Sequence, residues 1–372
     1  MNADIELDKL PPAAQKVLSA EAPGPVKMMA ARGVIPGAKP GDIVTVISVL
    51  ASGEDEKLAE TAKATLRKLP PPILQGALTA DLPGSVILQL ALGYPNDHDI
   101  ITALLRLPRI NGEALEQMAA AADERAGELI ATNEELMLKH PTVIEKLYMN
   151  KRVRMSTADR LVELAVRHNL ELDIPAFFEA AQAIKNELIS EPTEEPSFDD
   201  VLFTEAEALA AKLQLDAEKP DTHEIDEEGE EQLRKDALPL HAKIATMTVS
   251  QKIRTATLGN AAARLLLVRD PNRLVATAAI KSPLMRENEA TQISASRSVS
   301  EDVLRQIALN REFMRSYQVK LNLVLNPRTP LTFSTRLIPH LRESDLRNMA
   351  KSKNVGSAVS QAVRQQLSRK EK

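Results

Sequence analysis

The side chains best suited to acid–base chemistry or metal binding are histidines, and they are scattered along the chain. No two stand four residues apart, the spacing at which one helix face would offer a pair of metal ligands. The segment YPNDHDI gathers Asp97, His98 and Asp99, which could form a carboxylate–histidine pair or a weak metal site. Because adjacent residues point in different directions, a polar turn between helices explains this segment better. The histidines are His98, His140, His168, His223, His241 and His340.

Acidic clusters at 300–302 and 343–345 look like paired catalytic carboxylates, but a structural explanation fits them better. Ser300, followed by two acidic residues, suits a helix start, where serine caps free N–H groups and carboxylates meet the helix dipole. The chain contains no cysteine, which excludes disulfides, thiolate nucleophiles and cysteine-bound metal centres. It also lacks a glycine-rich phosphate loop and a nucleophile elbow. These features predict a protein that is not an enzyme and has no cofactor or metal.

Charge is distributed unevenly along the 372 residues. Residues 191–236 carry 17 acidic and 4 basic side chains, a net charge of −13, whereas residues 241–372 carry 9 acidic and 23 basic ones, a net charge of +14. An acidic segment beside a basic one favours contact between the two, and such contact weakens with salt.

The basic residues of the C-terminal third are the candidate interaction surface. Helices that present arginines from successive layers can bind a protein partner or follow a phosphate backbone. The alternatives are contact with the acidic segment of the same chain, and binding of nucleic acid or an anionic membrane. Against nucleic acid, the chain has few aromatic residues on which bases could stack. The candidate residues are Arg297, Arg305, Arg311, Arg315, Arg328, Arg336, Arg342, Arg347, Lys351 and Lys353.

The elements that must position these residues are short helices punctuated by proline. In KPGDIVTVISVLASGEDEKLAETAKATLRKLP, Pro40 opens a helix and Gly53 interrupts it. The next helix carries Leu58, Ala62 and Leu66 on one face and stops before further prolines. With 44% hydrophobic but only 2% aromatic residues, Leu and Ala must form most of a closely packed helical core. No apolar run is long enough to cross a membrane, and the N-terminus has no signal-peptide pattern, which predicts a cytoplasmic protein.

An eight-residue pattern occurs twice, as IATNEELM at 130–137 and as IALNREFM at 307–314. The similarity continues downstream, where Arg152 corresponds to Arg328 and Arg160 to Arg336. This repetition predicts an internal duplication.

Asparagines recur at matching positions of the two copies and are predicted to cap helices. An asparagine can accept hydrogen bonds from free N–H groups at a helix start or occupy a left-handed position at a helix end. The stretch NPRTP combines two turn signals in a sharp corner. The alternative is that these asparagines line a binding groove, but their repeated spacing favours caps. The residues are Asn133, Asn150, Asn310 and Asn326, with Pro327 in the corner.

The stretch LNPRTPLTFSTRLIPHLRESDLRNMAKSKN resembles the leucine-rich repeat variant family, whose units pair an α-helix with a 3₁₀ helix around an Asn-Pro-x-Thr-Pro turn. ASGEDEKLAETAKATLRKLP and VRDPNRLVATAAIKSP are similar to degenerate HEAT repeats, although Leu58-Ala59 stands where HEAT units prefer Val-Arg. The founding leucine-rich repeat variant protein carries an iron–sulfur cluster, which a chain without cysteine cannot hold. The resemblance implies a right-handed helical superhelix used for binding, and it names no ligand.

The acidic segment 187–238 is too poor in large apolar residues to form a core and is predicted to be a partly disordered linker. Within it, residues 198–215 form a possible amphipathic helix with Leu202, Ala206, Leu209 and Leu213 on one stripe. Such a helix could dock on another protein or on a lobe of this chain, or be an ordinary helix of the stack.

Together these features predict an all-α helical-repeat solenoid of two lobes related by duplication. The expected parts are an N-terminal segment (1–24), an N-terminal lobe (25–186), the acidic linker (187–238) and a basic C-terminal lobe (239–372). The expected function is that of a non-catalytic intracellular scaffold or adaptor that binds protein partners. The alternative is a nucleic-acid-binding helical-repeat protein that uses the basic lobe.

Overall fold

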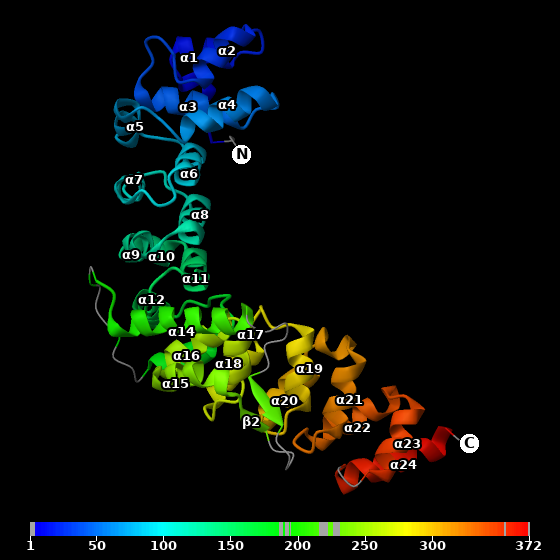
Figure 1. Cartoon of the computed structure of the whole chain (residues 1–372). Helices are drawn as coiled ribbons and strands as arrows, with labels where there is room; N and C mark the ends of the chain where they lie inside the picture. Colours follow the sequence, from blue (N-terminus) through cyan, green and yellow to red (C-terminus); the bar gives the residue numbers. More distant parts are fainter. Residues whose placement is uncertain are drawn as a thin grey trace. The chain divides into compact units, whose positions relative to one another are not determined.

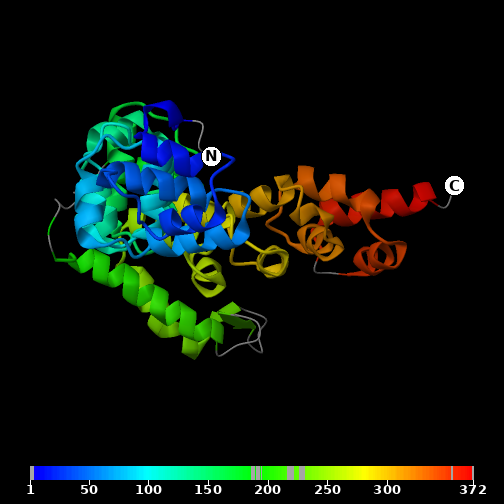
Figure 2. The ribbon, with the colours of Figure 1, turned by 90° about the horizontal axis from the view of Figure 1, so that it is seen from above.

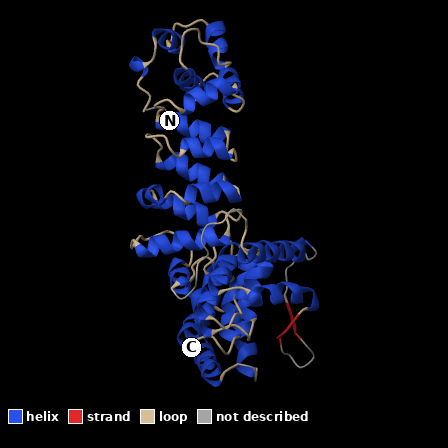
Figure 3. Ribbon diagram, turned by 90° about the vertical axis from the view of Figure 1, so that its left-hand side faces the viewer, coloured by secondary structure: helices blue, strands red, loops and turns tan. Residues whose placement is uncertain are grey.

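The computed structural model describes residues 4–185, 189, 193, 195–215, 222–225, 231–352 and 355–370. The regular structure of the described chain is helical, apart from two strands that form one small hairpin (Figure 3). The all-α prediction is therefore confirmed. The chain divides into two compact units, Met1–Asp173 and Ile174–Lys372. This boundary precedes the segment predicted as a linker.

The first unit is a succession of short helices. They are η1 (Leu7–Lys9), α1 (Pro12–Leu18), α2 (Gly24–Ala31), α3 (Pro40–Ala51), α4 (Glu56–Leu66), α5 (Pro71–Leu78), α6 (Gly84–Gly93), α7 (His98–Leu104), α8 (Gly112–Ala121), α9 (Glu124–Ala131), α10 (Glu134–Lys139), α11 (Pro141–Met149) and α12 (Met155–Arg167).

The expected punctuation by proline and polar caps is confirmed in this unit. Helix α3 begins at Pro40, where a missing N–H costs no helical hydrogen bond. Helix α4 follows after Gly53, and its N-cap Asp55 accepts a hydrogen bond of 3.1 Å from the Leu58 N–H. Leu58, Ala62 and Leu66 are all buried, as the spacing predicts. Helix α5 then begins at a proline in turn.

The helices of the first unit pack in two rows. In one row α6 packs against α3 and α8, and α8 packs against α11; in the other, α7 packs against α5 and α9, and α9 against α12. Figure 1 shows α6, α8 and α11 lying one above another. Each buried aliphatic side chain between layers contributes about 1.5–3 kcal/mol. Fully buried residues of the first row are Val86, Ile87, Leu90, Leu115, Met118, Ile144 and Leu147.

The second unit contains the remaining elements. They are α13 (Phe177–Ile184), α14 (Phe198–Leu215), β1 (His223–Ile225), β2 (Glu231–Leu233), η2 (Lys235–Ala237), α15 (Leu238–Thr246), α16 (Val249–Leu258), α17 (Ala261–Leu267), α18 (Arg273–Ile280), α19 (Glu287–Ala295), α20 (Glu301–Leu309), η3 (Phe313–Arg315), α21 (Tyr317–Leu325), α22 (Leu331–Leu337), η4 (Ile338–His340), α23 (Glu343–Lys351) and α24 (Ser357–Lys370).

Helices of the second unit also pack against the next helix but one. Helix α18 packs against α16 and α20, and α19 packs against α17 and α21. Figure 2 shows the succession from α19 to α24 in yellow, orange and red. At its end α24 packs against α22 and α23. Their apolar core consists of Val324, Ile338, Leu341, Leu346, Met349, Val355 and Val363.

The predicted amphipathic helix forms as α14 and packs against α15, α16 and α17 of the same unit. Its stripe differs from the predicted one. Leu202 and Ala206 are buried, but Leu209 and Leu213 are only half-buried. Phe203, one position along, is buried instead, with a 3% exposed fraction.

A buried arginine explains why Phe203 faces inward. Arg254 of α16 has an exposed fraction of 0%, and its guanidinium carbon lies 5.2 Å from the centre of the Phe203 ring. A cation over an aromatic face is attracted by the electron-rich ring, most strongly where water is excluded. Glu205 of α14 also forms an ion pair with Lys243 of α15. These contacts hold α14 against the second unit.

A buried ion pair joins α17 to α19. Arg264 donates from Nε and Nη2 to the two carboxylate oxygens of Glu289 at 2.9 and 2.7 Å, and from Nη1 to the Gly259 carbonyl at 2.5 Å. The side chains of Arg264 and Glu289 are 4% and 2% exposed. A bidentate pair this deeply buried is stable only while both partners are present.

We expect Glu289→Ala to lower the free energy of unfolding by about 3–5 kcal/mol, because it leaves the Arg264 guanidinium buried without its counter-charge. Urea denaturation followed by circular dichroism measures the change, and hydrogen exchange assigns it to the second unit.

The double variant Arg264→Met/Glu289→Leu provides the control. It removes both charges together, so it should recover most of that loss. A single variant that unfolds at the wild-type urea concentration would show that the pair contributes nothing.

Candidate functional site

Asn150, one of the repeated asparagines, connects two neighbouring helices. It follows the last residue of α11, and its Nδ2 donates to the carbonyls of Ala119 and Ala122, at the end of α8, at 2.9 and 2.8 Å. Its Oδ1 accepts from the Arg152 N–H at 3.0 Å. The last carbonyls of a helix have no partner within it, so this amide satisfies two of them from the next layer.

Asn326 makes the same set of contacts in the second unit. It follows the last residue of α21, and its Nδ2 donates to the carbonyls of Ser294 and Ser296, at the end of α19, at 2.9 and 2.7 Å. Its Oδ1 accepts from the Arg328 N–H at 3.0 Å. Asn150 and Asn326 therefore occupy equivalent positions with equivalent partners.

A serine forms the corresponding hydrogen bond between α16 and α18. Ser282, just after α18, donates from Oγ to the Thr257 carbonyl near the end of α16 at 2.7 Å. The same Oγ accepts from the Leu284 N–H, two residues later, at 3.3 Å. We call the contacts of Asn150, Ser282 and Asn326 the interlayer hydrogen bonds. No residue repeated between the two copies marks Ser282 as such a contact.

Asn133 acts as a predicted N-cap, whereas Asn310 is the C-cap residue of α20 and its side chain bonds to the turn that follows. Asn133 accepts from the Leu136 N–H at 3.3 Å at the start of α10. Asn310 accepts from the Glu312 N–H at 2.9 Å, just before η3.

The left-handed alternative is wrong for the asparagines at helix ends, because Asn150 and Asn326 have φ of −84° and −77°. The extended backbone there aims the amide at the preceding layer. Pro327 lies in the predicted corner, where the Thr329 N–H donates to the Asn326 carbonyl at 3.1 Å.

All described residues of the candidate interaction surface are exposed, and Lys353 lies outside the described residues. Several of them are engaged locally. Arg305 pairs with Glu301 and Asp302, and Arg347 pairs with Glu343. The remaining engaged ones are Arg328, which donates to the Val299 carbonyl at 3.3 Å, and Arg342, whose guanidinium carbon lies 4.6 Å from the centre of the Tyr317 ring.

Arg297, Arg311, Arg315, Arg336 and Lys351 differ from these, since no carboxylate of the described chain lies within ion-pair distance of their side chains. Arg311 lies two residues before η3, Arg315 is the last residue of η3, and Arg336 lies near the end of α22. A cation without a local carboxylate keeps its full attraction for an external anionic group. These residues are therefore the available part of the predicted surface.

The acidic clusters lie at helix starts. Ser300 stands at the N-cap position of α20, but its side chain makes no capping hydrogen bond, so that detail of the prediction is wrong. Asp302, in the first turn of α20, instead pairs with Arg273 at 2.9 Å. In the other cluster, Asp345 accepts a hydrogen bond from the Tyr317 hydroxyl.

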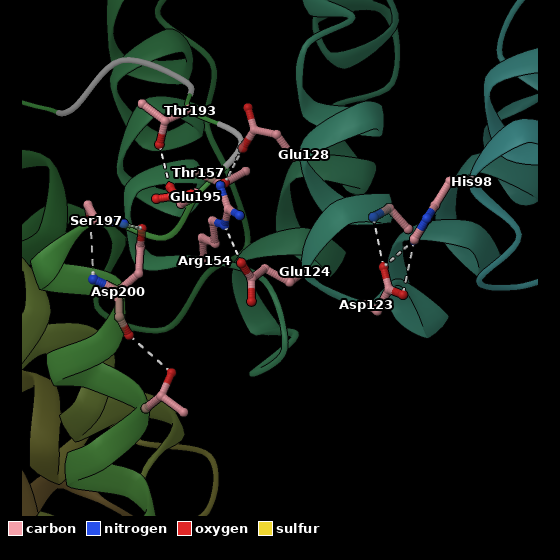
Figure 4. Close-up of polar contacts among 12 residues, drawn as sticks. His98, Asp123, Glu124, Glu128, Arg154, Thr157, Thr193, Glu195, Ser197 and Asp200 are labelled. Carbon is pink, nitrogen blue, oxygen red and sulfur yellow. Dashed lines mark hydrogen bonds and ion pairs between the residues drawn. The ribbon is translucent and has the colours of Figure 1, made fainter.

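His98 pairs with an acid that its own segment does not supply. Its Nε2 lies 3.1 Å from both carboxylate oxygens of Asp123, at the start of α9 (Figure 4). Asp97 instead caps α7 by accepting from the Ile100 N–H at 3.2 Å. Burial raises the pKa of Asp123, but hydrogen bonds from the Ala126 N–H and from His98 outweigh it and lower the pKa below 3.8. The pair ties α7 to α9, as the ion pair of Arg154 with Glu124 ties α12 to α9 (Figure 4).

A carboxylate of the acidic segment is bound in the second unit. Glu231 of β2 accepts hydrogen bonds from Ser296 Oγ at 2.7 Å, from Ser298 Oγ at 2.6 Å and from the Arg297 N–H at 3.1 Å. Arg269 Nη2, just after α17, lies 3.5 Å from the same carboxylate. We call these four donors the carboxylate cradle. Sequence reasoning missed it, because nothing marks Glu231 among its acidic neighbours.

The cradle favours the ionised form of Glu231. Burial by itself raises the pKa of Glu231, but the hydrogen bonds from Ser298 and Ser296, the charge of Arg269 and the Arg297 N–H together lower it below 4.5. The cradle is also held together without Glu231. The Ser298 N–H donates to Ser296 Oγ at 3.3 Å, and Ser298 Oγ accepts from Arg269 Nε at 3.1 Å.

A cavity of about 510 Å³ adjoins the cradle, between the hairpin and helices α15 to α17. Its lining includes the apolar side chains of Leu233, Ile244 and Leu266. It also includes Lys252 and Asp270, which form an ion pair of 3.0 Å. His223 and His241 also line it, so the hairpin and the helices each contribute a histidine.

Across the residues that the structure describes, no three metal-ligating side chains gather as a metal site would require. Nor does any helix in this part of the chain have the length and apolarity needed to cross a membrane. Comparison of the chain with protein-family models, with curated proteins and with solved structures finds no match.

The interlayer hydrogen bonds predict an order of stabilities. Asn326→Ala should lower the free energy of unfolding by about 1–3 kcal/mol, because two carbonyls lose their donor. Asn326→Asp should cost more, since a carboxylate would face those carbonyl oxygens. The control Asn133→Ala removes a simple cap and should cost about 1 kcal/mol. Urea denaturation measures all three, and equal effects of Asn326→Ala and Asn326→Asp would contradict the assignment.

The lowered pKa of Glu231 predicts a pH dependence of the hairpin contact. Since the pKa in the folded state lies below 4.5, the cradle stabilises the ionised form. This stabilisation is complete above the unfolded-state pKa and is lost as the pH falls through the folded-state value. An NMR titration of the Glu231 carboxyl carbon should therefore give a midpoint below 4.5. A midpoint at or above the value for unfolded glutamate would show that the cradle does not hold the carboxylate.

Proposed function

We propose that this protein is a non-catalytic scaffold or adaptor, and that exposed basic residues of its second unit bind an acidic surface of a protein partner. The observation that carries the proposal is the group Arg311, Arg315 and Arg336. These side chains are exposed, and no carboxylate of the described chain neutralises them. Complementary charge steers association and selects partners.

We further infer that the helices form a repeat array of the HEAT or leucine-rich repeat variant kind, with an internal duplication. The support comes from paired contacts. Asn133 and Asn310 accept N–H groups of the following short helix, and Asn150 and Asn326 bond the helix of the preceding layer. Helical arrays of this kind offer an extended surface for binding proteins.

The copies differ where they would meet a partner. In the first copy Arg160 forms an ion pair with Glu128. The corresponding residues of the second copy are Arg336 and Arg305, which are both basic. Arg305 turns to Glu301 and Asp302 instead. Equivalent positions therefore form an internal ion pair in the first copy and hold exposed cations in the second copy. This difference supports binding of a partner by the second copy.

The test is affinity capture with the full chain at low salt, followed by measurement of affinity for each captured partner. We expect Arg311→Glu/Arg315→Glu/Arg336→Glu to weaken binding by on the order of tenfold or more, because attraction becomes repulsion. The matched control Lys57→Glu/Lys63→Glu/Lys68→Glu reverses the same charge at exposed positions of the first unit. It should leave binding unchanged.

Two results would overturn the proposal. One is equal loss of binding in the control, which would show that net charge alone matters. The other is capture that disappears on nuclease treatment. In that case the affinity should fall steeply and linearly on a logarithmic salt scale, as phosphate contacts require.

A further inference from the structure

The carboxylate cradle has the properties of a recognition site. Its donors come from separate elements, with Ser296, Arg297 and Ser298 following α19 and Arg269 following α17. The Ser298 N–H donates to Ser296 Oγ and Arg269 Nε donates to Ser298 Oγ, so both hydroxyls are positioned while their hydrogens remain available to a carboxylate. When the donors are already in position, binding an anionic group costs little conformational entropy.

The residues beside Glu231 add a second feature. Successive side chains of a strand point to opposite faces, and in β2 Glu231 and Leu233 are half-buried whereas Gln232 is exposed. Leu233 lines the cavity, as do the apolar residues Ile244 and Leu266. On one face of this extended segment, Glu231 is therefore held by the cradle and Leu233, two positions along, borders the adjoining cavity.

The hairpin that presents these residues is small. Each strand has three residues, paired as His223 with Leu233, Glu224 with Gln232 and Ile225 with Glu231. Ile225 is 74% exposed, so the hairpin buries little apolar surface of its own. A two-stranded hairpin is marginally stable by itself in water, and its position therefore depends on what the cradle and the cavity bind.

We propose that the cradle and the adjoining cavity recognise an extended acidic-x-aliphatic segment of a protein partner, and that Glu231 and Leu233 occupy this site in cis. This inference rests on the proposed function, since it gives the adaptor a second contact with its partner. The hairpin excludes weak ligands, because a tethered segment acts at a local concentration on the order of millimolar. A partner must displace β2 to bind.

The experiment uses the full chain and a fluorescein-labelled peptide with the sequence of residues 222–234, THEIDEEGEEQLR. Fluorescence anisotropy measures its affinity for the wild type and for Glu231→Gln, which keeps the side-chain shape but loses the charge. We expect the peptide to bind Glu231→Gln about tenfold or more tightly than the wild type, because the cis competitor is weakened. The matched control Glu224→Gln removes the same charge from the exposed side of the hairpin and should bind as the wild type does.

Two further variants test the cradle directly. Adding Ser296→Ala/Ser298→Ala to Glu231→Gln should abolish the gained affinity while circular dichroism remains unchanged. A peptide with glutamine at the position of Glu231 should bind weakly to every variant. Hydrogen exchange of β1 and β2 amides should be faster in Glu231→Gln than in Glu224→Gln.

Equal affinity of the wild type and Glu231→Gln would overturn the inference, as would a gain in Glu224→Gln as large as in Glu231→Gln. Release of the peptide by inorganic phosphate, but not by sodium chloride of equal ionic strength, would identify a phosphate site instead. The triple charge reversal at Arg311, Arg315 and Arg336 leaves the cradle intact. If the peptide does not bind but binding of the partner still depends on those arginines, this inference is wrong and the proposed function stands.

Discussion

The structure depends on how the carbonyl groups at helix ends are satisfied. Every short helix ends with carbonyls that have no partner within it, and a chain of such helices accumulates many of them. Asn150, Ser282 and Asn326 solve the problem in one way, by donating to the end of the helix in the preceding layer. Because the side chain that reaches across is short, the hydrogen bond also fixes how closely and in what register two layers pack.

This requirement explains which features the sequence could predict. Caps and proline starts depend on residues within one turn, so Pro40 and Asn133 identify helix starts correctly. The role of Asn326 depends on Ser294 and Ser296, which lie one layer earlier. No local pattern contains that partner. The Arg264–Glu289 pair and the inward position of Phe203 could not be predicted for the same reason, because both depend on residues of a neighbouring helix.

Charge counts are similarly incomplete until partners are known. The C-terminal third has a large excess of basic residues, yet its arginines are not equivalent. Arg264 lies in the core with Glu289, Arg305 and Arg347 pair within their own helices, and Arg342 stacks on Tyr317. Pairs between exposed side chains contribute little stability, typically about 0–1 kcal/mol. Their effect is to reduce the electrostatic field that a partner meets, so this field comes mainly from cations without a paired carboxylate, among them Arg311, Arg315 and Arg336.

The acidic segment shows the opposite case, where one charge among many has a defined partner. Most carboxylates of an acidic stretch gain by remaining in water, because removal from water costs several kcal/mol unless hydrogen bonds replace the lost hydration. Glu231 receives such replacements from Ser296, Ser298 and Arg297. Glu224, the one carboxylate of β1, is exposed and has no comparable set of donors among the described residues. The hairpin is attached mainly through one side chain, Glu231, so a carboxylate of a partner can take its place. The apolar contacts of α14 with α15, α16 and α17 involve several buried side chains and cannot be replaced in this way.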